Sequence, residues 1–311
     1  MELGVHLPLL DFRGEGFSRR RIVDAAEAAR DLGFDAVSAN DHLVFRRPWL
    51  DGLTALAAVI EHSGEMALAT TTALSVVRGP VPLAKAIAAL DLLSGGRLEP
   101  SLGPGSSARD YEAVDVPFDE RWARYDESLR IVRAALRDEP VEGTVRFYPE
   151  PPSLEPRPSR PVPLWVASWG SEVGLRRVAR HGDGWLASAY NITAEDFALG
   201  RTRLDGELVK AGRDPNGFPT ALATMWTWIA DGPAEVEETL REILAPAIGR
   251  EPDELRDRVC VGSPAEVAQR LSSYAEAGCR RVYVWPLGDE VRQLDRLARE
   301  VRPLLASAAR A

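Results

Sequence analysis

The sequence has few of the residues that build metal centres and disulfide frameworks. It contains 2 cysteines and 4 histidines in 311 residues. Cys260 and Cys279 do not have a metal-binding spacing, and the histidines are well separated, so no zinc signature is present. We therefore expect two reduced, partly buried thiols and no bound metal.

Long apolar runs and an excess of positive charge are also absent. No segment approaches the roughly 18 apolar residues that a membrane span requires. The first residues predict a strand and lack the features of a signal peptide. The formal net charge of -9 excludes a general positive field for nucleic acid. We expect a soluble, cytoplasmic protein that binds neither nucleic acid nor a membrane.

Short apolar runs alternate with longer amphipathic patterns along most of the chain. Strands are predicted at residues 3–7, 36–39, 66–73, 98–102, 163–167, 184–188, 220–229 and 281–285. Helices are predicted at residues 18–32, 53–62, 83–93, 120–136, 172–181, 194–211, 235–244 and 265–277, with a closing helix up to about residue 305. About eight strands, each followed by a helix, predict an α/β protein with a (β/α)₈ TIM barrel, a single domain over residues 1–311.

A proline-rich segment interrupts this alternation after the fourth βα unit, at about residues 139–162. Because a packed helix does not tolerate this density of proline, we predict an excursion that crosses the barrel, with a short strand at 145–148. The fourth strand is unusual for another reason. Glu99 adds a charge and Pro100 removes a hydrogen-bond donor, which predicts an irregular strand.

In a barrel of this kind the ligand binds at the loops that follow the strands. His42 lies after the second strand, and a histidine suits proton transfer because its usual pKa is near neutrality. Capping of backbone groups is the alternative role. After the fourth strand, the glycines of residues 103–107 let a flat ring or a phosphate approach the backbone, and Ser106 and Ser107 add donors. A plain turn explains these residues equally well.

Residues 168–172 come directly before a predicted helix, whose first N–H groups attract an anion such as a phosphate. The structural alternative is that Ser171 caps the helix and Glu172 favours its dipole; an inward-facing Glu172 would repel a phosphate. Cations on the mouth loops favour a polyanionic ligand, although chance placement explains some of them in an arginine-rich chain: Arg13, Arg46, Arg47, Arg78 and Arg109.

The combination of motifs resembles the bacterial luciferase-like superfamily of flavin- or coenzyme F420-dependent oxidoreductases, which have a (β/α)₈ barrel. The resemblance covers nearly the whole chain and rests on the order and spacing of residues 83–97, 102–105, 116–121, 163–167, 182–185 and 261–267. In deazaflavin-dependent members, an Asp-His pair after the second strand contacts the ring and donates a proton. Asp41 and His42 match that pair.

The resemblance implies further contacts at the same end of the barrel. A bulge in the third strand with a non-prolyl cis peptide is expected near Thr72 and Ala73, packed behind the ring. Ser75, Ser106 and Ser107 are expected at the cofactor, and Gly170 and Ser171 at its phosphate. Relatives of this kind are often dimers, so a homodimer is a further expectation.

The sequence also departs from one branch of the superfamily. Sugar-phosphate dehydrogenases have a glutamate just after the glycine-rich loop, where this chain has Ala108, and their phosphate-binding lysines have no counterpart. This argues against glucose 6-phosphate as the substrate. Trp49 and Trp169 are candidates to stack on a ring, and packing explains them equally well.

Our leading hypothesis is an F420-dependent oxidoreductase that transfers hydride between the deazaflavin and a small organic substrate. The nearest alternative is an FMN-dependent monooxygenase that uses reduced flavin and O₂. Two readings from other classes remain open: a non-catalytic flavin-binding relative, and an unrelated barrel hydrolase that uses Asp and His at the mouth.

Overall fold

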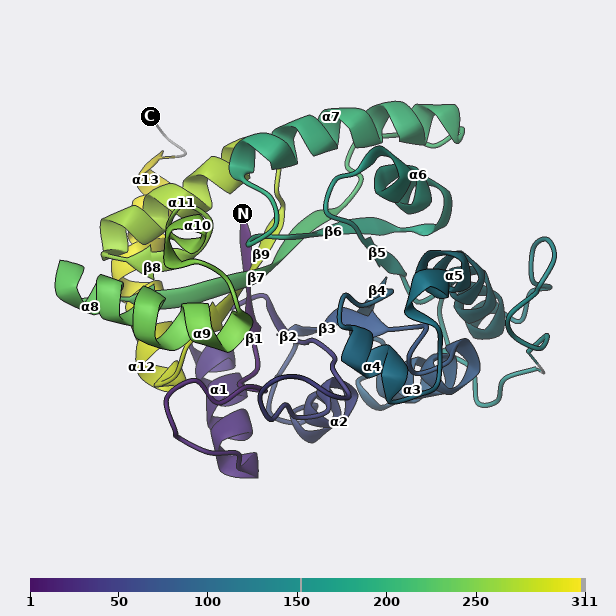
Figure 1. Ribbon diagram of the computed structural model, residues 1–311, viewed down its shortest axis with the longest axis horizontal. Helices are drawn as coiled ribbons and strands as arrows, with labels where there is room; N and C mark the ends of the chain where they lie inside the picture. Colours follow the sequence, from purple (N-terminus) through teal and green to yellow (C-terminus); the bar gives the residue numbers. More distant parts are fainter. Residues whose placement is uncertain (152, 309–311) are drawn as a thin grey trace.

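A closed barrel of eight parallel strands forms the centre of the computed structural model, which describes residues 1–151 and 153–308 (Figure 1). The strands follow each other in the order β6-β5-β4-β3-β2-β1-β9-β7, and a β6–β7 pairing closes the ring. Their bounds are β1 Glu2–His6, β2 Ala36–Ala39, β3 Ala67–Leu74, β4 Leu98–Gly103, β5 Trp165–Ala167, β6 Gly184–Ser188, β7 Thr220–Ile229 and β9 Arg281–Pro286. The predicted (β/α)₈ TIM barrel is confirmed.

One strand was not predicted. β8 (Cys260–Gly262) pairs in parallel with the end of β7, where Thr227 lies opposite Cys260, and so extends the sheet outside the closed ring. At three residues it is too short to give a periodic signal. Both cysteines are buried and neither forms a disulfide.

Helices surround the barrel, because the strands of a parallel sheet are buried on both faces and need a cover on the outer one. The longer helices are α1 Arg19–Asp31, α2 Gly52–Ala58, α3 Pro80–Leu93, α5 Arg121–Arg137, α6 Glu172–His181, α7 Ala194–Lys210, α11 Pro264–Glu276, α12 Glu290–Arg296 and α13 Arg302–Ala308. Shorter segments are α4 Ala108–Glu112, η1 Phe118–Glu120, α8 Pro233–Glu238, η2 Thr239–Leu244, α9 Ala245–Ile248, α10 Pro252–Arg256 and η3 Leu297–Val301. No helix in the described ranges has the length and apolar character to cross a membrane.

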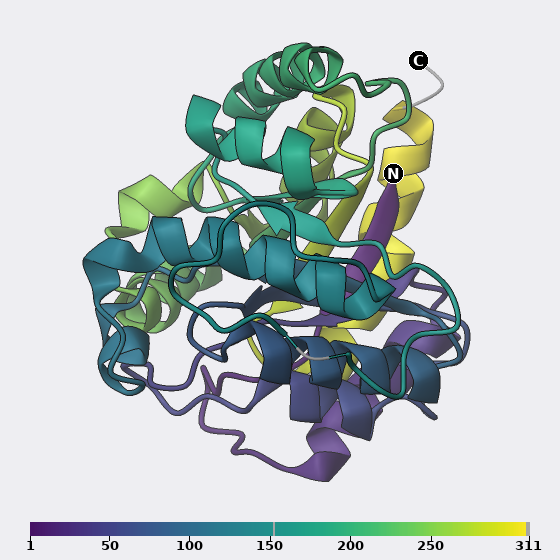
Figure 2. The same ribbon diagram turned by 90° about the vertical axis from the view of Figure 1, so that its right-hand side faces the viewer.

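The proline-rich segment passes outside α3 and α5 and does not cross the barrel (Figure 2). The predicted strand at residues 145–148 is wrong. Three consecutive backbone N–H groups there, from Arg146, Phe147 and Tyr148, donate to the buried Glu127 carboxylate on α5, at 2.8–2.9 Å. A carboxylate therefore accepts the hydrogen bonds that a neighbouring strand would have taken.

Glu99 has a structural explanation at the bottom of the barrel. Its Oε2 accepts a hydrogen bond from Arg281 on β9 at 2.6 Å, and Arg281 also pairs with Glu2 of β1 at 2.6 Å. Burial alone lowers the pKa of Arg281, but Tyr283, Glu99 and Glu2 outweigh it and raise that pKa. The charge predicted to be costly in β4 is thus part of a half-buried layer of ion pairs, at the end of the barrel opposite the loops that follow the strands.

Candidate active site

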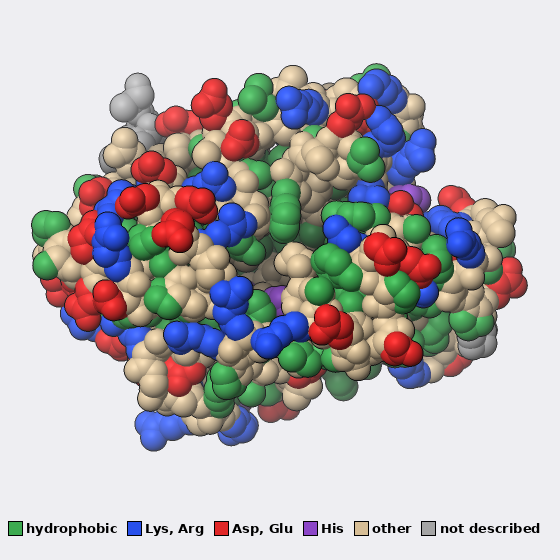
Figure 3. All heavy atoms as spheres, in the orientation of Figure 1, with side chains coloured by type: hydrophobic (Ala, Val, Ile, Leu, Met, Phe, Trp, Pro, Cys, Tyr) green, Lys and Arg blue, Asp and Glu red, His purple; other side chains and the backbone are tan. Residues whose placement is uncertain are grey.

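The predicted ligand-binding residues lie together at one end of the barrel. They lie at the ends of β2, β3, β4 and β5 or directly after them, and these strands are consecutive neighbours in the sheet, so the residues share one sector of the rim. The space-filling view shows the molecule hollowed near the centre of one face, with apolar side chains inside and Lys or Arg side chains on several sides (Figure 3). This geometry is typical of an active site in a (β/α)₈ barrel.

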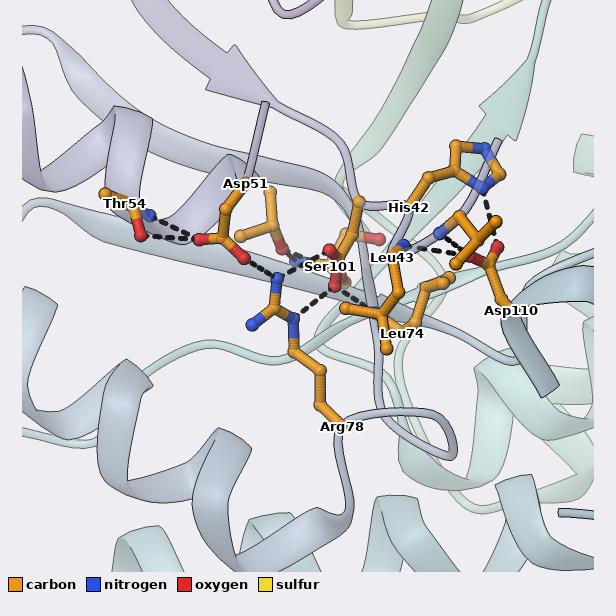
Figure 4. A network of polar contacts seen from close by, with 11 residues as sticks. His42, Leu43, Asp51, Thr54, Leu74, Arg78, Ser101 and Asp110 are labelled. Carbon is orange, nitrogen blue, oxygen red and sulfur yellow. Dashed lines mark hydrogen bonds and ion pairs between the residues drawn. The ribbon is translucent and has the colours of Figure 1, made fainter. Parts of the chain in front are cut away.

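His42 is held by a buried acid that the sequence did not reveal. Its Nδ1 donates to Oδ2 of Asp110 at 2.7 Å, and the Asp110 side chain is fully buried (Figure 4). Since a carboxylate accepts this hydrogen bond, Nδ1 carries the proton. Nε2 has no hydrogen-bond partner among the residues that the structure describes. The ring nitrogen opposite Asp110 is therefore available for a ligand.

Asp110 also shapes the loop that carries His42. Its Oδ1 accepts from the backbone N–H groups of Leu43 and Val44, both at 2.8 Å. Asp110 belongs to α4, which begins directly after the glycine-rich loop, and the neighbouring Tyr111 donates its hydroxyl to the Pro104 carbonyl. One short helix thus fixes both the histidine loop and the glycine-rich loop.

Asp41 is buried, and its side chain bonds to other residues of the protein. Its carboxylate accepts two hydrogen bonds from Arg78, at 2.6 and 2.7 Å, and one from the Leu74 backbone N–H at 3.1 Å. Arg78 also pairs with Asp51, the residue that caps α2. Burial alone lowers the pKa of Arg78, but the two carboxylates outweigh it and raise that pKa. Asp41 therefore ties the end of β3 to the histidine loop.

The non-prolyl cis peptide lies at Thr71-Thr72, one bond before the predicted position, and the β3–β4 register shifts between Thr71 and Ala73. Thr72 is half-buried beside Gly103, where an added Cβ would come within 2.6 Å of the Thr72 hydroxyl. Gly103 therefore leaves the space that Thr72 needs. Ala73 is buried, and Ser75 is fully buried with its hydroxyl 2.7 Å from that of Ser128 on α5. Ser75 thus bonds to α5 behind the strand.

The loops after β4 and β5, which carry the predicted serines, lie at the rim of the barrel. Ser106 is exposed and Ser107 is partly exposed, at the start of α4, where the structure gives Ser107 no capping bond. After β5, Gly170 has a φ of 88°, and Ser171 caps α6 by accepting from the Gly174 N–H at 3.2 Å. The capping role predicted for Ser171 is confirmed, and the N–H groups of Glu172 and Val173 have no acceptor among the described residues and remain for an anion.

Glu172 does not block this helix start. Its carboxylate accepts from Arg176 one turn along α6 at 2.7 Å, and its side chain is 73% exposed. The negative charge of Glu172 is thus paired with the positive charge of Arg176. The repulsion of a phosphate that an inward-facing Glu172 would cause is reduced accordingly.

The arginines predicted at the mouth fall into two groups. Arg78 is held in its ion pairs with Asp41 and Asp51, and the Arg13 guanidinium lies 3.7 Å from the centre of the Trp228 ring. The other three lack a carboxylate partner among the residues that the structure describes: Arg46, Arg47 and Arg109. Arg46 and Arg109 are exposed. These three cations keep their charge available for an acidic ligand.

His6, at the end of β1, is a second histidine of the mouth and was not singled out from the sequence. Its Nδ1 donates to the Leu7 carbonyl at 2.6 Å, and its Nε2 accepts from the Asn40 N–H at 3.0 Å. Burial lowers the pKa of His6 to about 3, against the two hydrogen bonds, which raise it. His6 is therefore neutral at pH 7 and fixes the start of the histidine loop.

This depressed pKa predicts a pH-dependent stability. Below the unfolded pKa of about 6.5, His6 binds a proton in the unfolded chain but not in the folded protein. The free energy of unfolding therefore decreases by about 1.4 kcal/mol for each unit that the pH is lowered, down to about pH 3. In urea unfolding at pH 7 and pH 5, His6→Gln should lose about 2 kcal/mol less than the wild type over this interval. Equal losses in both proteins would contradict this assignment.

Three tryptophans pack in a cluster that contacts His42 through Trp49, and only Trp49 had been noted from the sequence. Trp49 follows β2, Trp226 lies on β7, and Trp285 lies opposite it on β9. No local signal marks the last two, because an aromatic residue in a strand is more often core.

Asp110 could have been found, since an acid directly after a glycine-rich loop faces the same rim. In the described ranges, no group of three or more His, Cys, Asp or Glu side chains is arranged to hold a metal ion.

Comparisons with known proteins agree with this geometry. The F420-dependent glucose-6-phosphate dehydrogenase of Kribbella flavida is 26% identical over 94% of this chain and 96% of its own. The monooxygenase RslO1 of Streptomyces bottropensis has a TM-score of 0.82 at 23% identity, covering 97% of this chain and 99% of its own. An F420-dependent secondary alcohol dehydrogenase, in complex with an F420–acetone adduct, has a TM-score of 0.84 at 18% identity, covering 98% of each chain.

The family model described as luciferase-like monooxygenase matches residues 3–281, which is most of the chain. The chain therefore belongs to the luciferase-like monooxygenase family.

Proposed function

We propose that this protein is a coenzyme F420-dependent oxidoreductase that transfers hydride between the deazaflavin and a small organic substrate. The observation that carries the proposal is the His42–Asp110 pair. Among the described residues, this pair leaves Nε2 of His42 without a partner, at a barrel mouth bordered by arginines that have no carboxylate partner. The F420-dependent names of the relatives support the same choice of cofactor.

Buried polar groups without partners among the described residues support a ring ligand with several hydrogen-bonding atoms. The hydroxyls of Ser38, Thr71 and Ser101 and the Oδ1 of Asn40 have no partner among the described residues. They belong to β2, β3 and β4 or directly follow them, and Thr71 lies opposite Ser101. Such groups are costly to bury unless a ligand or water satisfies them. A deazaflavin ring supplies matching donors and acceptors.

The rest of the cofactor has candidate partners around the same rim. Thr72, Ala73, Ser106 and Ser107 would border the ring. Gly170 and Ser171, at the start of α6, would hold its phosphate. The uncompensated arginines of the mouth would face its acidic tail: Arg46, Arg47 and Arg109.

When bound, the cofactor supplies a hydride donor or acceptor. The chain's own part is to hold and move a proton. Asp110 keeps the proton of His42 on Nδ1, so Nε2 accepts a proton from a substrate hydroxyl or, once protonated, donates one to a substrate oxygen. The aromatic side chains next to His42 exclude water: Phe45 and Trp49 lie with their ring centres 4.6 and 4.8 Å from it.

An FMN-dependent monooxygenase is the second candidate, favoured by the likeness in fold to RslO1. FMN has a phosphate but no glutamyl tail, so it gives no role to the arginines beyond the phosphate site. Glucose 6-phosphate remains disfavoured as a substrate, because Ala108 stands where the sugar-phosphate branch has a glutamate and the phosphate-binding lysines of that branch have no counterpart.

Titration with each cofactor, followed by its own fluorescence, separates the two candidates. We expect F420 to bind more tightly than FMN, and we expect Arg46→Ala combined with Arg109→Ala to weaken F420 binding by about three- to tenfold. The matched control is Arg180→Ala, an exposed arginine at the other end of α6. Tight FMN binding without a response to F420 would overturn the proposal.

A further inference from the structure

A threonine in the middle of strand β7 has a backbone conformation that threonine rarely adopts. Thr224 has a φ of 55°, in the left-handed region, and the β7–β9 register shifts around it, between Leu222 and Met225. A branched Cβ makes this conformation costly, and such residues are concentrated at functional sites. Thr224 is also the one partly exposed residue of β7, whose other residues are buried. The strand is thus distorted at the residue that solvent reaches.

The distortion brings the Thr224 hydroxyl to the inside of the barrel. Leu186 of β6 and Ala223 of β7 belong to a buried cluster made only of strand residues, from β2, β3, β5, β6, β7 and β9, so this cluster fills the barrel. Because alternate residues of a strand share a face, Ser188 also points inside, whereas a regular strand would turn residue 224 outward. The hydroxyl oxygens of Ser188 and Thr224 nevertheless lie 2.7 Å apart. Ser188 ends β6, so the pair lies at the mouth.

Asn191, in the loop after β6, fixes the direction of the hydrogen bonds in this cluster. A guanidinium only donates, so the atom that faces Arg250 at 3.1 Å is Oδ1, and Nδ2 donates to Ser188 at 2.9 Å. The Thr224 hydroxyl donates to the Ala223 carbonyl at 2.7 Å. The Ser188 hydroxyl must therefore donate to Thr224. Both hydroxyl protons are thus used within the cluster.

Two acceptors and one donor remain free in the cluster. The Ser188 and Thr224 oxygens each keep a lone pair, and Asn191 keeps its second Nδ2 proton, since these atoms make no other hydrogen bond among the described residues. Thr224 and Asn191 are partly exposed, so a ligand can reach these groups. A hydroxyl group satisfies the set because it both donates and accepts. A carboxylate has no proton for the two oxygens, and an ammonium group cannot accept from Asn191.

The cluster lies across the barrel from His42. Around the closed ring, β6 is four strands away from β2 in either direction. One side of the mouth therefore carries the histidine that is proposed to move the proton, and the opposite side carries the free acceptors and the amide donor. A ligand that reaches both sides must have its hydroxyl group remote from the carbon that reacts.

We infer that Ser188, Thr224 and Asn191 bind a hydroxyl group of the substrate that is remote from the carbon to which hydride is transferred. The inference rests on the proposed function for the reacting end of the substrate. It gives the small organic substrate a chemical class, a hydroxyketone, which becomes the corresponding diol when it takes up a hydride and a proton. It also gives a role to the costly backbone of Thr224, since this conformation places the oxygen inside the mouth.

Methyl ketones of about five to eight carbons test the inference over a range of spans. At each length, one probe ends in a hydroxyl group, a second ends in a methyl group in its place, and a third ends in a carboxylate. In calorimetric titrations of the full chain with oxidised F420 bound, which cannot reduce a ketone, we expect the hydroxyketone of the best length to bind about tenfold more tightly than its methyl counterpart. A hydroxyl group without advantage at any length, or a carboxylate that binds more tightly, would overturn the inference.

Two variants locate the effect in the cluster. Ser188→Ala should reduce the affinity for the hydroxyketone to that for its methyl counterpart, whose own affinity stays unchanged. Thr224→Gly removes the second oxygen and should weaken the hydroxyketone about two- to tenfold; it is expected to fold, because glycine adopts the left-handed conformation freely. The matched control is Ser273→Ala on α11, where the hydroxyl bonds to the Arg270 carbonyl of its own helix at 2.8 Å. If both variants keep the full hydroxyl preference, the cluster has only a structural role.

Titrations with and without F420 distinguish this inference from the proposed function. F420 binding, followed by its own fluorescence, tests the cofactor assignment independently of the probes. If F420 binds and no hydroxyl preference is found, the hydroxyl site is wrong and the proposed function stands. If F420 does not bind but the protein alone prefers the hydroxyketone and loses this preference in Ser188→Ala, the hydroxyl site stands and the proposed reaction fails.

Discussion

Replacing His42 with glutamine should lower kcat of the F420-dependent reaction by about 10²- to 10⁴-fold and leave F420 affinity nearly unchanged. Glutamine leaves the bonds from the Leu43 and Val44 N–H groups to Asp110 in place, because these bonds do not involve the side chain at position 42. It cannot accept a proton at the position of Nε2. The loss should therefore appear in the proton-transfer step and not in binding.

Single-turnover oxidation of reduced F420, with the carbonyl compound that the wild type reduces fastest, measures this effect. The matched control is His62→Gln, since His62 bonds to Glu27 on α1. A His42→Gln variant with the wild-type rate would remove His42 from the mechanism.

The second large effect concerns Arg78. Replacing it with methionine should lower the free energy of unfolding by about 3–5 kcal/mol, because Asp41 is then left as a buried charge without its cation. The side chain of Asp41 is 3% exposed, so water cannot replace the guanidinium. Asp41 also accepts from the Leu74 N–H, so the end of β3 next to the cis peptide should loosen.

Urea unfolding of the variant measures the loss. Arg20→Met is the matched control, because its pair with Asp24 has side chains that are 89% and 46% exposed, and such pairs contribute about 0–1 kcal/mol. Adding Asp41→Asn to Arg78→Met should recover part of the stability, since it removes the unpaired charge. An Arg78→Met protein as stable as the Arg20→Met control would contradict the role given to this ion pair.

The barrel was predictable because its signal is local. Each strand is a short apolar run and each helix has an apolar face, so alternation along the chain indicates the fold. The proline-rich segment shows where local reasoning fails. Residues 145–148 have the pattern of a strand, but the Glu127 carboxylate on a preceding helix takes three of their N–H groups. That competition depends on a distant residue and leaves no periodic trace.

The site was predictable in position but not in its internal bonds. Spacing and resemblance placed His42 on the rim, and the structure puts it there. Its partner Asp110 lies 68 residues along the chain, so the pairing needs the three-dimensional structure. The same holds for Asp41 and Ser75, which were predicted to contact the cofactor and whose side chains bond to Arg78 and Ser128. A sequence shows which loops meet, whereas side-chain direction depends on what else is buried there.

A crystal structure of the protein with F420 tests the central claim most directly. We predict that the deazaflavin ring lies at the mouth of the barrel against Thr71-Thr72, with Nε2 of His42 within hydrogen-bond reach of the reacting face and the acidic tail beside Arg46 and Arg109. A ring bound away from these residues, or a site that takes up no F420 at saturating concentration, would contradict the account.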